Sequence, residues 1–96
     1  MAEVEIVSEK EEPGGWSFQV RIGEGASDDV TRTLRLSWAD YNLWSHDGSD
    51  PPHAVARAVA LFLLSRISVA DVPVTIDAST ARRRFPDADD EIPKLI

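Results

Sequence analysis

The sequence predicts an α+β domain in two layers: a three-stranded antiparallel meander packed against a main helix from the C-terminal half and one or two shorter helices. Two observations predict this fold. Residues 1–38 alternate apolar and polar side chains with the period of two that is typical of half-buried strands. Beyond residue 50 the apolar residues recur at helical spacing. The 96 residues leave room for a single domain, 1–96.

The N-terminal part supplies the three predicted strands, at about residues 2–9, 15–23 and 29–37, together about 2–38. The middle strand has the clearest pattern, because Trp16, Phe18 and Val20 alternate with polar residues. Breaker segments at residues 11–15 and 23–28 separate the strands and are long enough to reverse the chain. Consecutive strands joined by such short connections predict antiparallel pairing.

The C-terminal part supplies helices, expected at about residues 39–44, 51–67 and 77–85. Ser37 and Asp40 form a capping-box pattern before the first helix. Asp50 is the N-cap candidate for the main helix, and Asp77 is the candidate for the third. After the third helix, Pro93 limits any further helix to about one turn, so the tail from about residue 87 is expected to fray.

The predicted core consists of the inward side chains of the sheet and the main helix. It contains Val4, Ile6, Trp16, Phe18, Val20, Ile22, Leu34, Leu36, Val55, Val59, Phe62 and Leu63. Arg66 also falls within the apolar arc of the helix. Because a buried guanidinium needs a partner, we expect Arg66 either to reach water at the helix end or to bond Asp71 or Asp77.

Charge and composition exclude several classes of function. Seventeen acidic residues against ten basic ones give a net charge of −7, which repels a phosphate backbone, so nucleic acid is disfavoured as a partner. The sequence has no cysteine, which removes thiolate chemistry and disulfides and favours a cytoplasmic location. The longest apolar run, residues 58–64, is too short to span a membrane.

The sequence predicts neither an enzyme nor a bound cofactor. There is no Gly-x-Ser-x-Gly elbow and no P-loop. The one arrangement that resembles a metal site is formed by His46, Asp47, Asp50 and His53. These residue types are common in loops and helix caps for reasons of turn chemistry, and their spacing matches no known site, so we expect no metal.

A small non-enzymatic interaction or regulatory module is the leading functional hypothesis, with another protein or a second copy as partner. The free edges of the sheet can add a strand, and Leu61 and Trp44 are candidates for an exposed contact patch. The alternative is weak binding of nucleic acid or a phosphate ligand through Arg82, Arg83 and Arg84. Those arginines equally suit the end of a helix, where they can pair with nearby aspartates, Asp87, Asp89 and Asp90.

Four segments taken together resemble a family of short uncharacterised bacterial proteins. They are Trp16-Ser17-Phe18-Gln19-Val20, the strand end near Asp40-Tyr41, the run from Ala60 to Ser68, and Arg84-Phe85-Pro86-Asp87. These are packing and capping residues, so the resemblance implies a bacterial, cytoplasmic α+β domain and carries over no activity and no functional residue.

Overall fold

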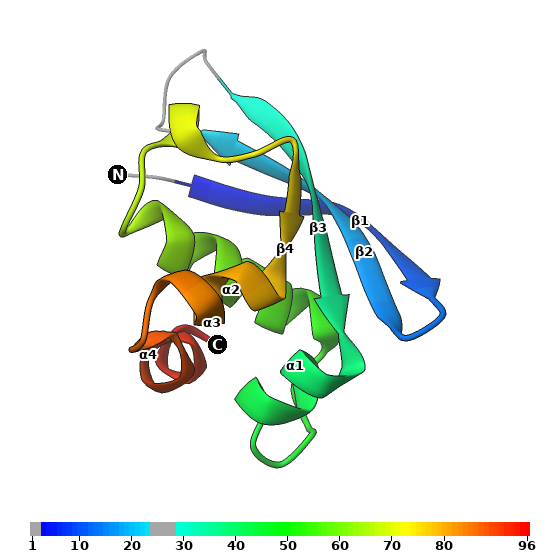
Figure 1. Cartoon of the computed structure of the whole chain (residues 1–96). Helices are drawn as coiled ribbons and strands as arrows, with labels where there is room; N and C mark the ends of the chain where they lie inside the picture. Colours follow the sequence, from blue (N-terminus) through cyan, green and yellow to red (C-terminus); the bar gives the residue numbers. More distant parts are fainter. Residues whose placement is uncertain (1–2, 24–28) are drawn as a thin grey trace.

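The computed structural model describes residues 3–23 and 29–96 and has one sheet with helices packed against it (Figure 1). The strands are β1 (Glu3–Glu12), β2 (Gly15–Gly23), β3 (Val30–Ser37) and β4 (Thr75–Asp77). The helices are α1 (Trp38–Trp44), α2 (Pro52–Leu64), α3 (Ala78–Arg84) and α4 (Ala88–Leu95), with a 3₁₀ turn, η1, at Val69–Asp71. The protein is therefore α+β, as the sequence predicts.

The sheet contains the predicted meander and one further strand. β1 pairs with β2 and β2 with β3, both antiparallel. β4 then pairs with β3 in parallel, with Thr33 opposite Thr75 and Arg35 opposite Asp77. The prediction of a three-stranded, purely antiparallel sheet is therefore wrong. β4 has only three residues, too few to display a period of two, and its partner strand lies far away in the sequence.

A tight turn joins β1 to β2. Only Pro13 and Gly14 lie between the two strands, and β1 therefore runs to Glu12, beyond its predicted end near residue 9. Gly14 has a φ of 86°. Proline followed by a glycine of positive φ is the pattern of a type II turn, which side chains other than glycine adopt only with strain.

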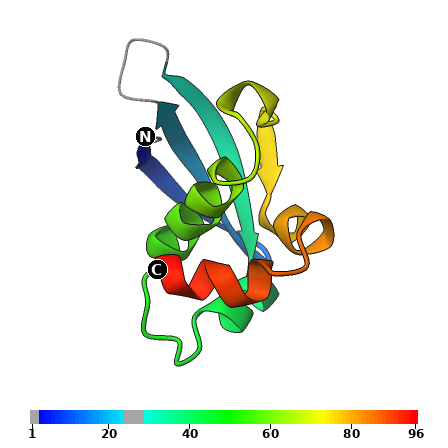
Figure 2. The same cartoon turned by 90° about the vertical axis from the view of Figure 1, so that its left-hand side faces the viewer.

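The core lies on one face of the sheet, where α2 crosses the strands with α4 beside it (Figure 2). Along β2 the residues Phe18, Val20 and Ile22 are buried, whereas Gln19 and Arg21 are exposed on the opposite face. All the predicted core residues are buried except Ile6, which is half-buried. The alternation of the sequence therefore identified the inner face of the sheet correctly.

The first three helices lie close to their predicted ranges, although the main helix is shorter at both ends. α2 ends at Leu64, and the Ser65 hydroxyl donates to the Phe62 carbonyl in its last turn. Asp50 does not cap this helix, because its carboxylate accepts a hydrogen bond from the Ser45 hydroxyl at 2.8 Å and Pro51 holds the cap position. Asp77 caps α3 as predicted, accepting from the amide of Ser79 at 3.0 Å.

The C-terminal tail does not fray but forms α4. Ala88 and Ile92 are fully buried there, and α4 packs against α2. Pro93 lies inside the helix. A proline in a helix removes one backbone hydrogen bond, and here the burial of the apolar side of α4 outweighs that loss. The prediction of a frayed tail is therefore wrong, because α4 is stabilised by tertiary packing that no local sequence pattern reveals.

Candidate functional site

The arginines predicted to bind an anion stand in the last turn of α3, but they do not converge. Arg83 donates to the Thr80 hydroxyl at 3.3 Å. The Arg84 guanidinium lies 5.3 Å from the centre of the Phe85 ring. Arg82 is bound to carboxylates. Successive helical residues point about 100° apart, so neighbouring arginines face different surroundings. The described residues therefore do not gather the three guanidiniums into one anion pocket.

Arg82 links three helices. Its guanidinium lies 3.3 Å from the Asp40 carboxylate of α1 and 3.1 Å from the Asp89 carboxylate of α4. Asp89 also accepts a hydrogen bond from the Trp44 indole at 3.0 Å. The predicted capping box is half formed, because the Ser37 hydroxyl accepts from the Asp40 amide while the Asp40 side chain turns to Arg82. The arrangement is that of a structural ion-pair network.

The contact patch predicted around Leu61 and Trp44 does not form. Trp44 is 1% exposed, and Leu61 is half-buried against the core. Trp44 is covered because the chain after residue 87 folds into α4, which packs against α1. Leu61 was a candidate because it falls in the polar arc of the helix beside Arg57 and Ser65, where it could either be covered by the C-terminal segments or be exposed.

Arg66 binds Asp87 rather than either of its expected partners, Asp71 and Asp77. The guanidinium donates to both oxygens of the carboxylate. Its carbon also lies 4.8 Å from the centre of the Phe62 ring. Hydrogen bonds from Arg66 lower the pKa of Asp87 below its ordinary value. Arg66 thus fastens the end of α2 to the residues before α4, which is a structural role.

The histidine and aspartate cluster shows no metal-binding geometry. The Asp47 carboxylate accepts hydrogen bonds from the amide and hydroxyl of Ser49, and these bonds lower its pKa. The Asp50 carboxylate is taken by Ser45. Across residues 3–23 and 29–96, no three residues among the His, Asp and Glu side chains are grouped so that they could hold a metal ion.

The outer edge of β1 is the most open part of the sheet. β1 is ten residues long, and it pairs with β2 on one side only because it is the first strand in the sheet order. On its other side no backbone hydrogen bond to another described element is formed. The opposite edge is the three-residue β4, which leads directly into α3. An unpaired strand edge presents a row of N–H and C=O groups that another chain can pair with.

A β-bulge changes which face the second half of β1 presents. The register against β2 shifts between Ile6 and Ser8, so Val7 is the extra residue. Beyond the bulge Glu9 lies opposite Phe18, and Glu11 lies opposite Trp16. Cross-strand partners share a face, so these glutamates project from the face that carries the core. Both are nevertheless exposed, which means that this end of β1 extends past the helical layer.

Three aromatic rings pack against one another in tilted and edge-on arrangements near the β1–β2 turn. The rings of Trp16 and Trp38 have centroids 4.4 Å apart, and Tyr41 lies 5.2 Å from Trp16 and 6.1 Å from Trp38. Trp16 and Tyr41 are buried, whereas Trp38 is 47% exposed. The backbone fixes this position, because the Trp38 amide donates to the carbonyl of Gly14 in the β1–β2 turn. About half of a rigidly held indole therefore faces solvent near the β1–β2 turn, against Trp16, the cross-strand partner of Glu11.

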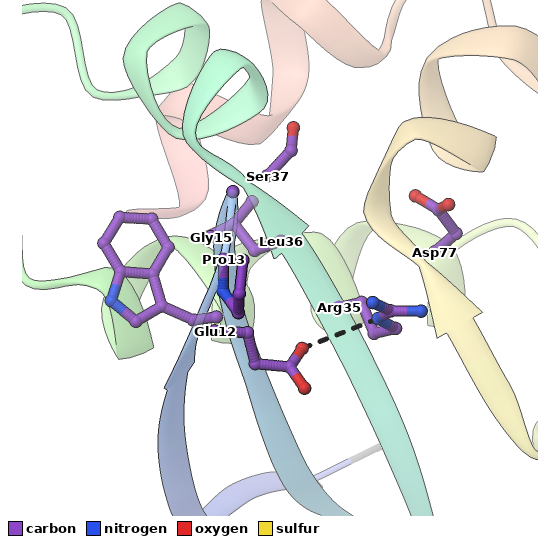
Figure 3. A pocket seen from close by; sticks show the side chains of 9 residues that line it. Glu12, Pro13, Gly15, Arg35, Leu36, Ser37 and Asp77 are labelled. Carbon is purple, nitrogen blue, oxygen red and sulfur yellow. Dashed lines mark ion pairs between the residues drawn. The ribbon is translucent and has the colours of Figure 1, made fainter.

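A hollow of about 270 Å³ lies at the same end of the sheet, and its lining includes Trp16 and the β1–β2 turn. Figure 3 shows the Arg35 guanidinium between the carboxylates of Glu12 and Asp77. Arg35 and Glu12 form an ion pair at 3.6 Å. The cationic side chain that lines the hollow is therefore already partnered, and the surroundings of this end of β1 are acidic.

Comparison with known proteins gives no relative: no family model, curated protein or solved structure matches the chain. The resemblance to short uncharacterised bacterial proteins therefore stays a prediction. Among the helices that the structure describes, none has the length and apolar character needed to cross a membrane.

The sequence indicated a free edge but not the features that surround it. The bulge at Val7 cannot be recognised from the apolar pattern of the sequence. An extra residue in one strand becomes visible only when the pairing of β1 with β2 is known. Trp38 lies between the predicted third strand, 29–37, and the predicted first helix, 39–44, and in the structure it begins α1 and is half-exposed. The available signal was the Ser37 cap, which places Trp38 at the first helical position rather than in the strand.

Proposed function

We propose that this protein is a small non-enzymatic interaction module that binds another protein by adding an extended segment of that partner to the outer edge of β1. The observation that carries the proposal is the unpaired side of a ten-residue strand at the edge of a four-stranded sheet. Strand addition obtains its affinity from main-chain hydrogen bonds and its specificity from alternate side chains.

Three properties of the edge support this proposal over binding at the other edge. β1 is longer than the three-residue β4 and therefore offers more backbone groups. The β1–β2 hairpin is held by the complete β2–β3 ladder beside it, so the edge is preorganised. The exposed Trp38 supplies apolar contact area at the end of the edge.

We propose a non-enzymatic role because two serine hydroxyls are engaged in hydrogen bonds within the fold. The hydroxyls of Ser45 and Ser65 donate to Asp50 and to the Phe62 carbonyl, respectively. Nucleophilic catalysis by a hydroxyl requires both a base that accepts its proton and access to the substrate, and Ser45, although it is bonded to a carboxylate, is only 2% exposed. Among the described residues, Ser45 is buried and Ser65 is exposed at the end of α2, and both hydroxyls make hydrogen bonds that stabilise the local fold.

Site-specific photo-cross-linking tests the proposal. A photoreactive residue is placed at Val7, in β1, or at Val74, which is also exposed but precedes β4. After capture from a nuclease-treated cell lysate, the Val7 position should cross-link to one recurrent protein and Val74 should not. Cross-linking at Val74 alone, or loss of every partner after nuclease treatment, would contradict strand addition at β1; the second result would instead favour nucleic acid.

A further inference from the structure

The charge of β1 and the position of Trp38 specify the chemistry of the partner. We infer that the added strand is basic, with Lys or Arg at every second position, and that one of these side chains stacks on the Trp38 indole near the β1–β2 turn. This inference rests on the proposed strand addition and names the class of segment that fits it.

The side chains of β1 carry a strong negative charge. Five of its ten residues are glutamates and one is a lysine. Glu5 and Glu12 are partly neutralised across the sheet by Arg21, at 2.9 Å, and by Arg35. The ion pairs of the described residues do not include Glu3, Glu9 or Glu11. These three carboxylates are therefore available to a partner.

This charge selects against a second copy of the chain. Two β1 strands side by side would bring glutamates close to glutamates, and like charges on neighbouring strands destabilise a sheet. Charged side chains on an edge are also a common means of preventing self-association. A basic strand is instead attracted to β1, because each of its positive charges lies near a carboxylate. We therefore assign the edge to a basic segment of another protein.

The bulge sets the spacing of the basic side chains. Glu9 and Glu11 share one face of β1, whereas Ser8 and Lys10 share the other with Glu12. Residues two apart in an added strand also share a face. Lys or Arg at alternate positions therefore meets Glu9 and Glu11, and the intervening positions, which pass Lys10, should be neutral. Thr or Ser suits those positions.

Trp38 completes a site for one of the cations. Tryptophan is the aromatic side chain that binds cations best, and a guanidinium can bond a carboxylate while its plane lies on a ring. Trp16 connects the two components, because it lies opposite Glu11 in the register and 4.4 Å from Trp38 between ring centres. Arg is therefore preferred over Lys at the position nearest the β1–β2 turn.

Titration with synthetic peptides tests this inference. Four capped peptides of about nine residues, near the length of β1, have alternating Arg and Thr, alternating Glu and Thr, only neutral residues, or the Arg and Thr sequence with N-methylated backbone amides. Affinity is measured by fluorescence anisotropy at low and at physiological salt. The unmethylated Arg peptide should bind most tightly and lose affinity with salt.

Protein variants separate the two components of the site. Trp38→Ala should weaken binding of the Arg peptide about two- to fivefold, the range for an exposed cation–π contact. Glu11→Gln should weaken it by a similar factor without altering the core. Asp90→Asn in α4 is the matched control for a single lost charge, because Asp90 is exposed and lies away from β1, and it should leave affinity unchanged within error.

The outcomes distinguish the inference from the function on which it rests. If the acidic or neutral peptide binds as tightly as the Arg peptide, strand addition survives and the basic partner is refuted. If the N-methylated Arg peptide binds as tightly as its parent, or if no peptide binds, strand addition at β1 is itself refuted. Equal affinities of Trp38→Ala and wild type would remove Trp38 from the site.

Discussion

Replacing Arg82 with alanine should destabilise the protein by about 2 kcal/mol. The variant leaves Asp40, which is 3% exposed, without its guanidinium partner. A hydrogen bond to a charged group contributes about 1.5–3 kcal/mol, and Arg82 is itself partly exposed, so the lower part of that range applies. The second pair, with Asp89, lies at the surface and adds only about 0–1 kcal/mol.

Urea unfolding followed by tryptophan fluorescence measures this loss. A thermal scan should show a fall in Tm of about 8–16 °C, since each kcal/mol corresponds to about 4–8 °C in a domain of this size. Arg83→Ala is the matched control: Arg83 is the adjacent arginine in the same turn, but within residues 3–23 and 29–96 its side chain bonds only Thr80, so its loss should cost no more than about 0.5 kcal/mol. Equal losses for the two variants would refute the account of Arg82.

A double-mutant cycle isolates the contribution of the Arg82–Asp40 pair. In an Asp40→Asn background, Arg82→Ala should cost only the small contribution of the exposed pair with Asp89. A loss as large as in the wild-type background would mean that Arg82 acts through contacts other than the Asp40 carboxylate.

Three further predictions concern the core and the C-terminal helix. Phe62→Ala should cost about 3–5 kcal/mol in urea unfolding, because Phe62 is 1% exposed; an unchanged midpoint would exclude it from the core. Ile92→Ala should cost about 2–5 kcal/mol, since Ile92 anchors α4 and is fully buried, whereas a frayed tail would show no loss. Arg66 lowers the pKa of Asp87, so the stability from this pair is complete above the unfolded-state pKa near 3.8 and is lost as the pH falls through the lower folded-state pKa. The stability of Asp87→Asn should therefore depend less on pH in that acidic range than that of wild type, and parallel curves would contradict it.

The sequence predicts the meander and the inner face because both follow from local alternation. Trp16, Phe18, Val20 and Ile22 show the period of two directly, and their burial agrees with it. The start of α3 was also predictable, since Asp77 carries the capping signal within its own residues. Features whose cause lies within a few residues are the ones that a single sequence reveals.

Features that depend on distant residues were missed. β4 forms because Thr75 and Asp77 find Thr33 and Arg35, which no local pattern announces. α4 forms because Ile92 is buried against another helix, although Pro93 argues locally for a break. Both omissions had the same physical origin, namely tertiary packing that overrides local propensity.

The candidate site was predictable only in outline. A free edge follows from any open sheet, so it was expected before the structure was known. Glu9 and Glu11 project from the core-bearing face of β1 because of the register shift at Val7. The position of Trp38 depends on the hydrogen bond from its amide to the Gly14 carbonyl. The alternative anion site at the arginines of α3 and the candidate contact patch at Trp44 both have structural contacts instead, because α4 packs against both regions.

Amide hydrogen exchange, resolved residue by residue, tests the central claim most directly. In the free protein the amides of residues 3–12 should fall into two classes, with those facing β2 slow to exchange and those facing outward fast. Saturation with the alternating Arg and Thr peptide should slow the outward-facing class and leave the amides of β4 unchanged. Protection of β4 or the helices, with outward β1 amides exchanging as fast as before, would contradict strand addition at β1.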